Sequence, residues 1–166
     1  MDIHEVAVGR VISAPVETVW ALIADIALMP RFSTELQHVE WAEGFDTPAL
    51  GARFNGANRH PRVGEWTTTS TIVQYDPPRV FGWAVGDPQN PAATWQFELA
   101  TADNACSLRY TARIGPGPSG VTMLIARQPD RAAQIITDRL AALSCAMADT
   151  LAGVAALAEG VAGDRR

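Results

Sequence analysis

The sequence predicts an α+β fold in which seven antiparallel strands form one sheet that packs against a long C-terminal helix, with two short helices after the first strand. Three observations predict it. Residues 3–13 are rich in β-branched side chains and alternate loosely. Residues 36–110 fall into short aromatic and β-branched runs separated by turn residues. Residues 129–159 carry the longest helical periodicity in the chain.

The first strand, 3–13, ends where Pro15 and Glu17 favour a helix N-terminus. The apolar residues that follow recur at helical spacing and indicate one apolar face; they are Val16, Trp20, Ile23 and Ala27. Because proline interrupts helices, Pro30 ends this segment. We expect a second short helical piece over 31–35.

The middle of the chain predicts an antiparallel meander. Its turns contain Gly, Pro, Asp and Asn, as in Asp76-Pro77-Pro78 and Asp103-Asn104. The six strands expected between these turns cover residues 36–43, 51–60, 64–75, 79–86, 92–101 and 106–115. The strand at the N-terminus completes the predicted set.

A helix from Pro129 to about Glu159 follows and would be ~45 Å long. Its apolar stripe consists of Ile136, Leu140, Leu143, Met147, Leu151, Val154 and Leu157. We expect Gly153 to weaken the last turns and residues 160–166 to form a frayed tail. Residues 1–166 contain no linker or internal repeat, so a single domain is expected.

The segment from Gly115 to Gly120 reads Gly-Pro-Gly-Pro-Ser-Gly and matches the G-x-G-x-x-G pattern of dinucleotide-binding loops. Its prolines have no N–H to offer a phosphate, and the apolar run after it, 121–126, does not predict a helix start. We therefore interpret the segment as a turn.

The 166 residues include 18 acidic side chains and 13 basic ones, all arginine, for a net charge of −5. This balance disfavours nucleic-acid binding, and the absence of lysine excludes Schiff-base and P-loop lysine chemistry. No stretch approaches the roughly 18 apolar residues of a membrane span, and no secretory signal is recognisable, so a cytoplasmic protein is expected. The oligomeric state stays open, a homodimer included.

No metal or cofactor is expected. Cys106 and Cys145 form no C-x-x-C pair and are expected to be free, partly buried thiols. His4, His38 and His60 stand at no metal-ligand spacing. The sequence also lacks the G-x-S-x-G nucleophile elbow, so covalent catalysis has no positive support.

Local motifs accompany this order of elements. They are Ala14-Pro15-x-x-x-Val19-Trp20-x-x-Ile23-x-Asp25, Gly51-x-Arg53-Phe54, Trp66 opening a strand, Asp76-Pro77-Pro78 before Phe81-x-Trp83, and Trp95-x-Phe97-x-Leu99. Over roughly residues 3–159 the sequence resembles the START/Bet v 1-like (SRPBCC) superfamily with its helix-grip fold, and more narrowly its bacterial polyketide cyclase/dehydrase branch.

The resemblance implies a sheet wrapped around the C-terminal helix, with an elongated, mostly apolar cavity between them. Our first hypothesis is that this cavity binds a small hydrophobic or aromatic molecule, such as a lipid or a polyketide-like compound, as the chain's partner. The rival is a polyketide cyclase or dehydratase acting on a ligand in the same cavity. A third reading is a protein-interaction module with a collapsed cavity. Resemblance in fold alone does not choose among them.

Strand alternation indicates which side chains face the long helix, because alternate residues share one face of a sheet. The expected ligand-binding set comprises Phe54, Asn58, Trp66, Ser70, Trp83, Trp95, Phe97 and Tyr110 from the strands, with Leu140, Leu143 and Met147 from the helix. The opposite set, which includes Arg53, Arg59, Arg109 and Arg113, is expected to face solvent. The inward tryptophans suit a planar ligand, although cores select the same rings.

Tyr110 and His60 are the candidate catalytic residues. Tyr110 could donate a hydrogen bond to a ligand carbonyl, and His60 could act as a general base near neutral pH, although its place at a strand end also fits an exposed turn. Asn58 and Ser70 could orient a ligand. Glu65 is the carboxylate nearest the expected lining and has no acidic partner, so a paired-acid mechanism is unsupported.

Overall fold

The computed structural model describes residues 4–61 and 64–163, and its elements follow the predicted order. The strands are β1 (His4–Ile12), β2 (Leu36–Trp41), β3 (Arg53–His60), β4 (Gly64–Asp76), β5 (Val80–Asp87), β6 (Asn90–Ala102) and β7 (Ala105–Ile114). The helices are α1 (Val16–Ile23), the 3-10 helix η1 (Ile26–Phe32), α2 (Gly120–Arg127), the 3-10 turn η2 (Pro129–Arg131) and α3 (Ala132–Gly163). The predicted α+β fold is confirmed.

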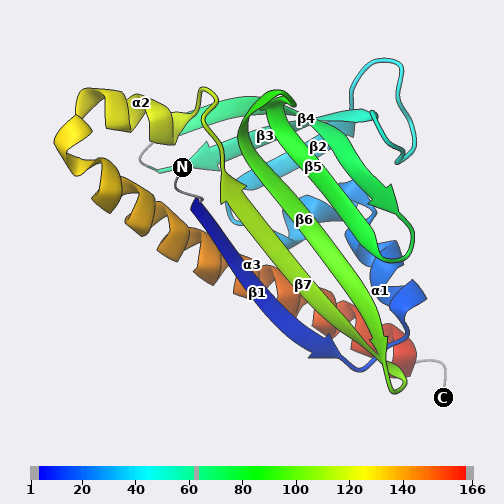
Figure 1. The fold of residues 1–166 in the computed structure, drawn as a ribbon. Coiled ribbons are helices and arrows are strands. Elements are labelled where there is room, and N and C mark those ends of the chain that lie inside the picture. Colours follow the sequence, from blue (N-terminus) through cyan, green and yellow to red (C-terminus); the bar gives the residue numbers. More distant parts are fainter. Residues whose placement is uncertain (1–3, 62–63, 164–166) are drawn as a thin grey trace.

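The strands form one antiparallel sheet in the order β1-β7-β6-β5-β4-β3-β2. Figure 1 shows the sheet curving, with α3 crossing behind β1 and β7. The register sets Trp83 opposite Trp95 and Phe97 opposite Tyr110. The predicted inward residues therefore share one face, called here the inner face, and the arginines predicted to face solvent, Arg53, Arg59, Arg109 and Arg113, are exposed.

The C-terminal half of α3 supplies the helical side of the core. Met147, Leu151 and Val154 are at most 2% exposed, and α3 contacts β1, β7, α1 and η1. The helix is also long and apolar enough, by length and composition alone, to cross a membrane. The sequence expectation concerned an unbroken run of apolar residues, which this helix does not contain because Asp138, Arg139 and Asp149 interrupt it.

Gly153 is a close-packing residue of α3. A Cβ atom at this position would lie 2.8 Å from Cδ1 of Phe32 in η1. The same contact is held by a hydrogen bond from Thr150 Oγ1 to the Phe32 carbonyl at 3.1 Å. The prediction that this glycine only weakens the helix missed its packing role. α3 continues past Glu159 to Gly163, and residues 164–166 of the predicted tail lie outside the described residues, as does residue 3 of the predicted first strand.

The second short helix is placed differently from the prediction of 31–35. η1 begins after Asp25, whose carboxylate accepts a hydrogen bond from the Ala27 N–H at 3.0 Å. Pro30 lies inside η1. A 3-10 helix tolerates it here because so short an element has few internal hydrogen bonds for a proline to remove.

The apolar run after the Gly-Pro-rich segment forms α2, which the sequence did not predict. Ser119 and Thr122 make a reciprocal capping box at its start. The loop before it still does not resemble a phosphate cradle: the N–H groups of Gly115 and Gly117 donate to the carbonyls of Ala92 and Pro91, both at 2.9 Å. A Cβ at either glycine would fall 2.1 Å from a main-chain oxygen, so both glycines serve close packing on β6.

The register of β4 shifts between Ile72 and Gln74. Before the shift, Ile72 lies opposite Trp83; after it, Tyr75 lies opposite Phe81. The extra residue, Val73, is 41% exposed. This β-bulge returns Tyr75 to the core side of the sheet, where strict alternation would have placed Gln74.

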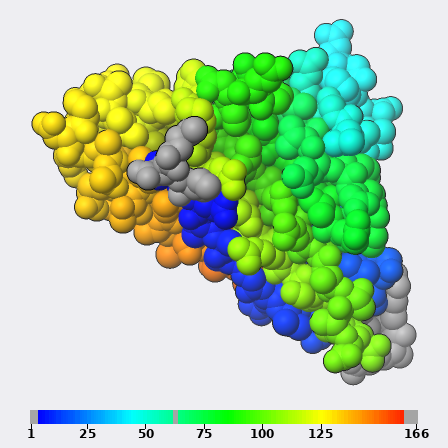
Figure 2. Space-filling view, viewed as in Figure 1, coloured from blue at the N-terminus to red at the C-terminus, as the bar shows by residue number. Residues whose placement is uncertain are grey.

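Two parts of the molecule project from the body in Figure 2: the yellow segment of α2, η2 and the first turns of α3, and the cyan connection between β2 and β3. α2 has no buried residue, and Met123 and Leu124 on it are exposed. The N-terminal part of α3 thus packs against α2, while the remainder covers the sheet.

Candidate functional site

An aromatic cluster covers the inner face of β5, β6 and β7. Phe97 and Tyr110 stack with ring centroids 4.0 Å apart, and Trp95 lies 5.4 Å from Tyr110. Trp83 stacks on Trp95 at 6.4 Å and meets Phe54 at 6.2 Å. Five of the predicted ligand-binding residues are therefore brought together, largely by packing against one another.

Two buried hydroxyl groups border this cluster. Ser70 is 4% exposed and Tyr110 is 8% exposed. Within the described residues neither hydroxyl has a hydrogen-bond partner, and neither oxygen is wholly sealed from solvent. Because each oxygen lacks a protein partner and reaches solvent, it can bond to water or to a ligand, so these two groups are the open polar positions of the inner face.

The β3–β4 side of the inner face is more open. Asn58 lies opposite Trp66 in the ladder, Thr68 lies opposite Gly56, and Asn58, Trp66 and Thr68 are half-buried. On α3, Leu140 is half-buried as well. The side chains Leu143 and Met147 are instead buried in the core. The predicted lining thus divides into a closed part and an open part.

The two candidate catalytic residues are far apart in the sheet. Tyr110 lies on β7 and His60 at the end of β3, with β4, β5 and β6 between them. His60 is half-buried and pairs with Gly64 across the turn. Burial raises the pKa of the Tyr110 hydroxyl above its ordinary value, so at neutral pH it is a hydrogen-bond donor and not a base.

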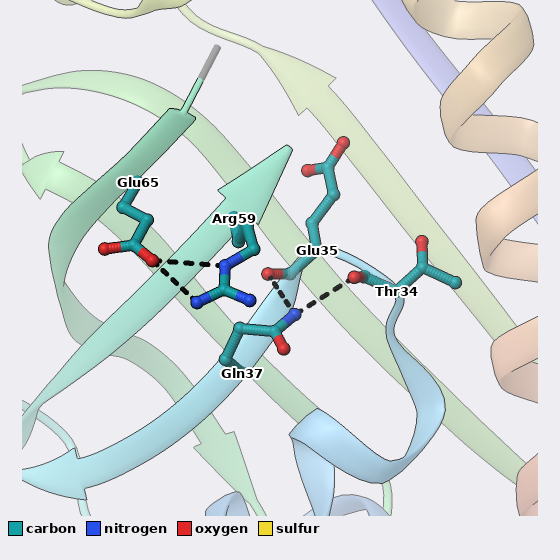
Figure 3. A network of polar contacts seen from close by, with 5 residues as sticks. All are labelled: Thr34, Glu35, Gln37, Arg59 and Glu65. Carbon is teal, nitrogen blue, oxygen red and sulfur yellow. Dashed lines mark hydrogen bonds and ion pairs between the residues drawn. The ribbon is translucent and has the colours of Figure 1, made fainter. Parts of the chain in front are cut away.

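Figure 3 shows polar contacts at the β2, β3 and β4 edge of the sheet. The Arg59 guanidinium donates two hydrogen bonds to Glu65 Oε1, at 2.7 and 3.1 Å. The Gln37 amide donates to the carbonyls of Thr34 and Glu35. Glu65 is exposed and paired with Arg59, and both residues line a hollow of about 440 Å³ together with the predicted lining residues Asn58 and Trp66. Glu65 thus lies next to the predicted lining, as expected.

Glu35 and Arg139 form an ion pair that sequence reasoning missed. Arg139 Nη1 lies 3.3 Å from Glu35 Oε1, with side chains 35% and 30% exposed. The pair joins the N-terminal half of α3 to the connection between η1 and β2. The sequence did indicate that Arg139 lies near the packed side of α3, because it stands at helical spacing from Ile136 and Leu143 in the apolar stripe.

The cysteines offer no catalytic thiol. Cys106 is fully buried, and burial, the largest cause, raises the pKa of its thiol. Cys145 is exposed on α3, not partly buried as expected, because it lies off the apolar stripe. Across residues 4–61 and 64–163, no group of three or more His, Cys, Asp or Glu side chains is placed to hold a metal ion.

The curved sheet, the two short helices after β1 and the long helix over the inner face define a protein with the helix-grip fold. Within that class, the chain belongs to the polyketide cyclase/dehydrase and lipid transport family, whose model matches residues 4–147. None of the curated proteins matches the sequence.

Solved structures agree with this assignment. A polyketide-cyclase-like protein from Corynebacterium glutamicum is 25% identical, with a TM-score of 0.70 over 95% of this chain and 93% of its own. An aromatase/cyclase from Streptomyces is 20% identical, with a TM-score of 0.68 over 95% and 94%. A di-domain aromatase/cyclase of the steffimycin pathway is 15% identical, with a TM-score of 0.76 over 97% of this chain and 52% of its own. The family and these neighbours support a ligand-binding or cyclase role.

Proposed function

We propose that the chain binds a small hydrophobic or aromatic molecule, lipid or polyketide-like, against the inner face of its sheet under α3. The observation that carries the proposal is the pair of unpartnered hydroxyls, Ser70 and Tyr110, next to the aromatic cluster. Ser70 lies on β4 and Tyr110 on β7, with β5 and β6 between them, so separate oxygens of one ligand would satisfy the two groups. The ligand's apolar body would cover Trp66 and Trp95, which are half-buried.

The hydroxyl groups of Tyr110 and Ser70 restrict which chemical groups a ligand would carry. Tyr110 can donate a hydrogen bond, since its raised pKa keeps the proton on the ring oxygen, and Ser70 can donate or accept. No charged side chain belongs to the aromatic cluster, and the two charged residues of the hollow at Asn58 and Trp66, Arg59 and Glu65, pair with each other. The favoured ligand is therefore neutral and carries carbonyl or hydroxyl groups on an apolar skeleton.

Ligand release and titration test this proposal. The purified protein is denatured and the released small molecules are identified by mass spectrometry. In parallel, the five tryptophan indole N–H signals are followed by NMR while a panel of fatty acids, hydroxylated naphthalenes and anthraquinones is added. We expect saturable shifts at Trp66 and Trp95. No saturable binding across the panel, together with no released molecule, would refute the proposal.

Single variants test the two hydroxyls. Tyr110→Phe and Ser70→Ala each remove one hydrogen bond and should weaken binding of an oxygenated aromatic ligand by about three- to tenfold. Ser107→Ala, an exposed position on β7, is the matched control and should leave the dissociation constant unchanged. Equal affinities for all three variants would show that the ligand lies elsewhere.

The alternative function is polyketide cyclisation or dehydration at the same place, and the aromatase/cyclase neighbours favour it. Here the cavity would orient a poly-β-ketone, and Tyr110 would polarise a carbonyl oxygen by hydrogen bonding while an enol carbon attacks the carbonyl carbon. If Tyr110→Phe and His60→Ala both leave turnover of a cyclising substrate unchanged, these roles fail. The cytoplasmic location and the homodimer expected from the sequence stay predictions.

A further inference from the structure

A hollow lies beside α1, at the β2 end of the inner face and away from the predicted ligand-binding set. It is an open groove of about 450 Å³ between α1, the start of η1, β2, the β2–β3 connection and the end of β4. Its lining consists of Trp20, Ala21, Ala24, Asp25, Ile26, Ala27, Val39, Glu40, Trp41, Asp46, Pro48 and Tyr75. It shares no residue with the predicted ligand-binding set, but it belongs to the same face of the sheet, since Trp41 lies opposite Phe54 and Tyr75 opposite Phe81 in the ladder.

Three aromatic rings form the apolar part of the groove. Trp20 and Tyr75 lie 5.8 Å apart and both meet Phe81 of the core at 6.1 Å. Trp41 meets Phe54 edge-on at 6.2 Å. All three are half-buried: each packs against the core and also lines the groove. Because the core holds them, the positions of these three side chains are fixed before any ligand arrives.

The charges of the groove have one sign. Asp25, Glu40 and Asp46 line it, and no arginine or histidine belongs to its described lining. One carboxylate oxygen of Asp25 accepts a hydrogen bond from the Ala27 N–H. Among the described residues, the carboxylate of Glu40 has one basic neighbour, the exposed His38, at 3.7 Å. In the part of the chain that the structure describes, Asp46 has no hydrogen bond or ion pair. Negative charge around bare aromatic surface is complementary to a cation.

The geometry favours an organic cation over a metal ion. Across the described ranges, no three acidic or metal-binding side chains converge closely enough to hold a metal, so the carboxylates surround the groove and do not meet at one point. A quaternary or tertiary ammonium group lies well over Trp and Tyr faces, since the ring quadrupole attracts a weakly hydrated cation. The carboxylates add attraction without requiring direct coordination.

We propose that this groove binds an organic ammonium ion with an apolar body, held by Trp20, Trp41 and Tyr75 and steered by Asp25, Glu40 and Asp46. The proposal does not depend on the inner-face ligand. The two sites use different tryptophans: Trp20 and Trp41 line the groove, while Trp66, Trp83 and Trp95 belong to the predicted ligand-binding set.

The tryptophan indole N–H signals report on both sites in one experiment. Choline is added to the isotopically labelled protein, and its neutral isostere 3,3-dimethylbutan-1-ol is the control ligand of the same shape. We expect choline to shift the Trp20 and Trp41 signals saturably and the alcohol to bind at least about fivefold more weakly. Equal binding of the two ligands, or shifts confined to Trp66, Trp83 and Trp95, would overturn the proposal.

Charge variants provide the second readout. Asp46→Asn lies in a loop and Glu40→Gln on an exposed strand position, so both are expected to fold; each should weaken choline binding about two- to fivefold. Asp130→Asn removes the same charge from η2, at the opposite end of α3 from α1, and should change nothing (Figure 1). If the three variants bind choline equally, the groove is not the site.

Discussion

The two halves of α3 differ in what they contact. From Leu143 onward the helix buries Met147, Leu151, Val154, Ala155 and Ala158 against β1, α1 and η1. Before Leu143, only Ile135 is buried, and the helix packs against the projecting α2. The C-terminal half therefore builds the core, whereas the N-terminal half is less buried, and the ligand contact expected of Leu140 stays a prediction.

The largest effect is expected from truncating one stripe residue in each half. Met147→Ala empties a fully buried site and should lower the free energy of unfolding by about 3 kcal/mol. Leu140→Ala, in the half-buried part, should cost about 1 kcal/mol or less. Urea denaturation followed by tryptophan fluorescence measures both. Equal losses would abolish the distinction between the halves.

A pair of glycine variants sharpens the comparison within the C-terminal half. Gly160→Ala meets nothing within 4 Å and should stabilise the helix by up to about 1 kcal/mol. Gly153→Ala gains the same propensity but places a methyl 2.8 Å from Phe32, so a net loss of about 1–2 kcal/mol is expected. Thermal unfolding of the two variants gives the difference. A Gly153→Ala protein as stable as Gly160→Ala would contradict the close packing of η1.

The smallest effect is expected in the N-terminal half. Arg139→Gln breaks the pair with Glu35, and because both side chains are about one-third exposed, the loss should stay below about 1 kcal/mol and shrink in high salt. Arg127→Gln on α2 is the matched control. A loss above about 2 kcal/mol for Arg139→Gln would mean that this half is also essential to the fold.

Most of the fold could be predicted because each element has a local signal. Alternation placed Trp83, Phe97 and Tyr110 on the inner face, and the apolar stripe placed Met147 on the sheet-facing side of α3, although the ligand contact expected of Met147 is replaced by burial in the core. The prediction failed where tertiary contacts decide. η1 depends on the Asp25 cap, and α2 on the Ser119–Thr122 box, which is short and lacks the acidic residue that usually marks such a start.

The candidate site could be predicted only in part. Strand parity identifies which residues share a face, but it does not show which of them pack against one another. From the sequence, the buried cluster around Trp83 and the half-buried region at Trp66 therefore could not be told apart. Long-range pairing was also invisible, since Glu35 and Arg139 are 104 residues apart. The groove at Trp20 and Trp41 was missed because its walls come from segments that are distant in the sequence.

The strand β4, with its bulge at Val73, contributes side chains to two different sites. Its first part presents Trp66 and Ser70 to the inner face, and one inserted residue later the same strand presents Tyr75 to the groove beside α1. Deleting Val73 would remove the bulge and keep Gln74 opposite Gly82 and Tyr75 opposite Phe81, because the inserted residue is the one that is lost. The insertion therefore changes the exposed side of β4 and not the residues that this strand presents to the core side of the sheet.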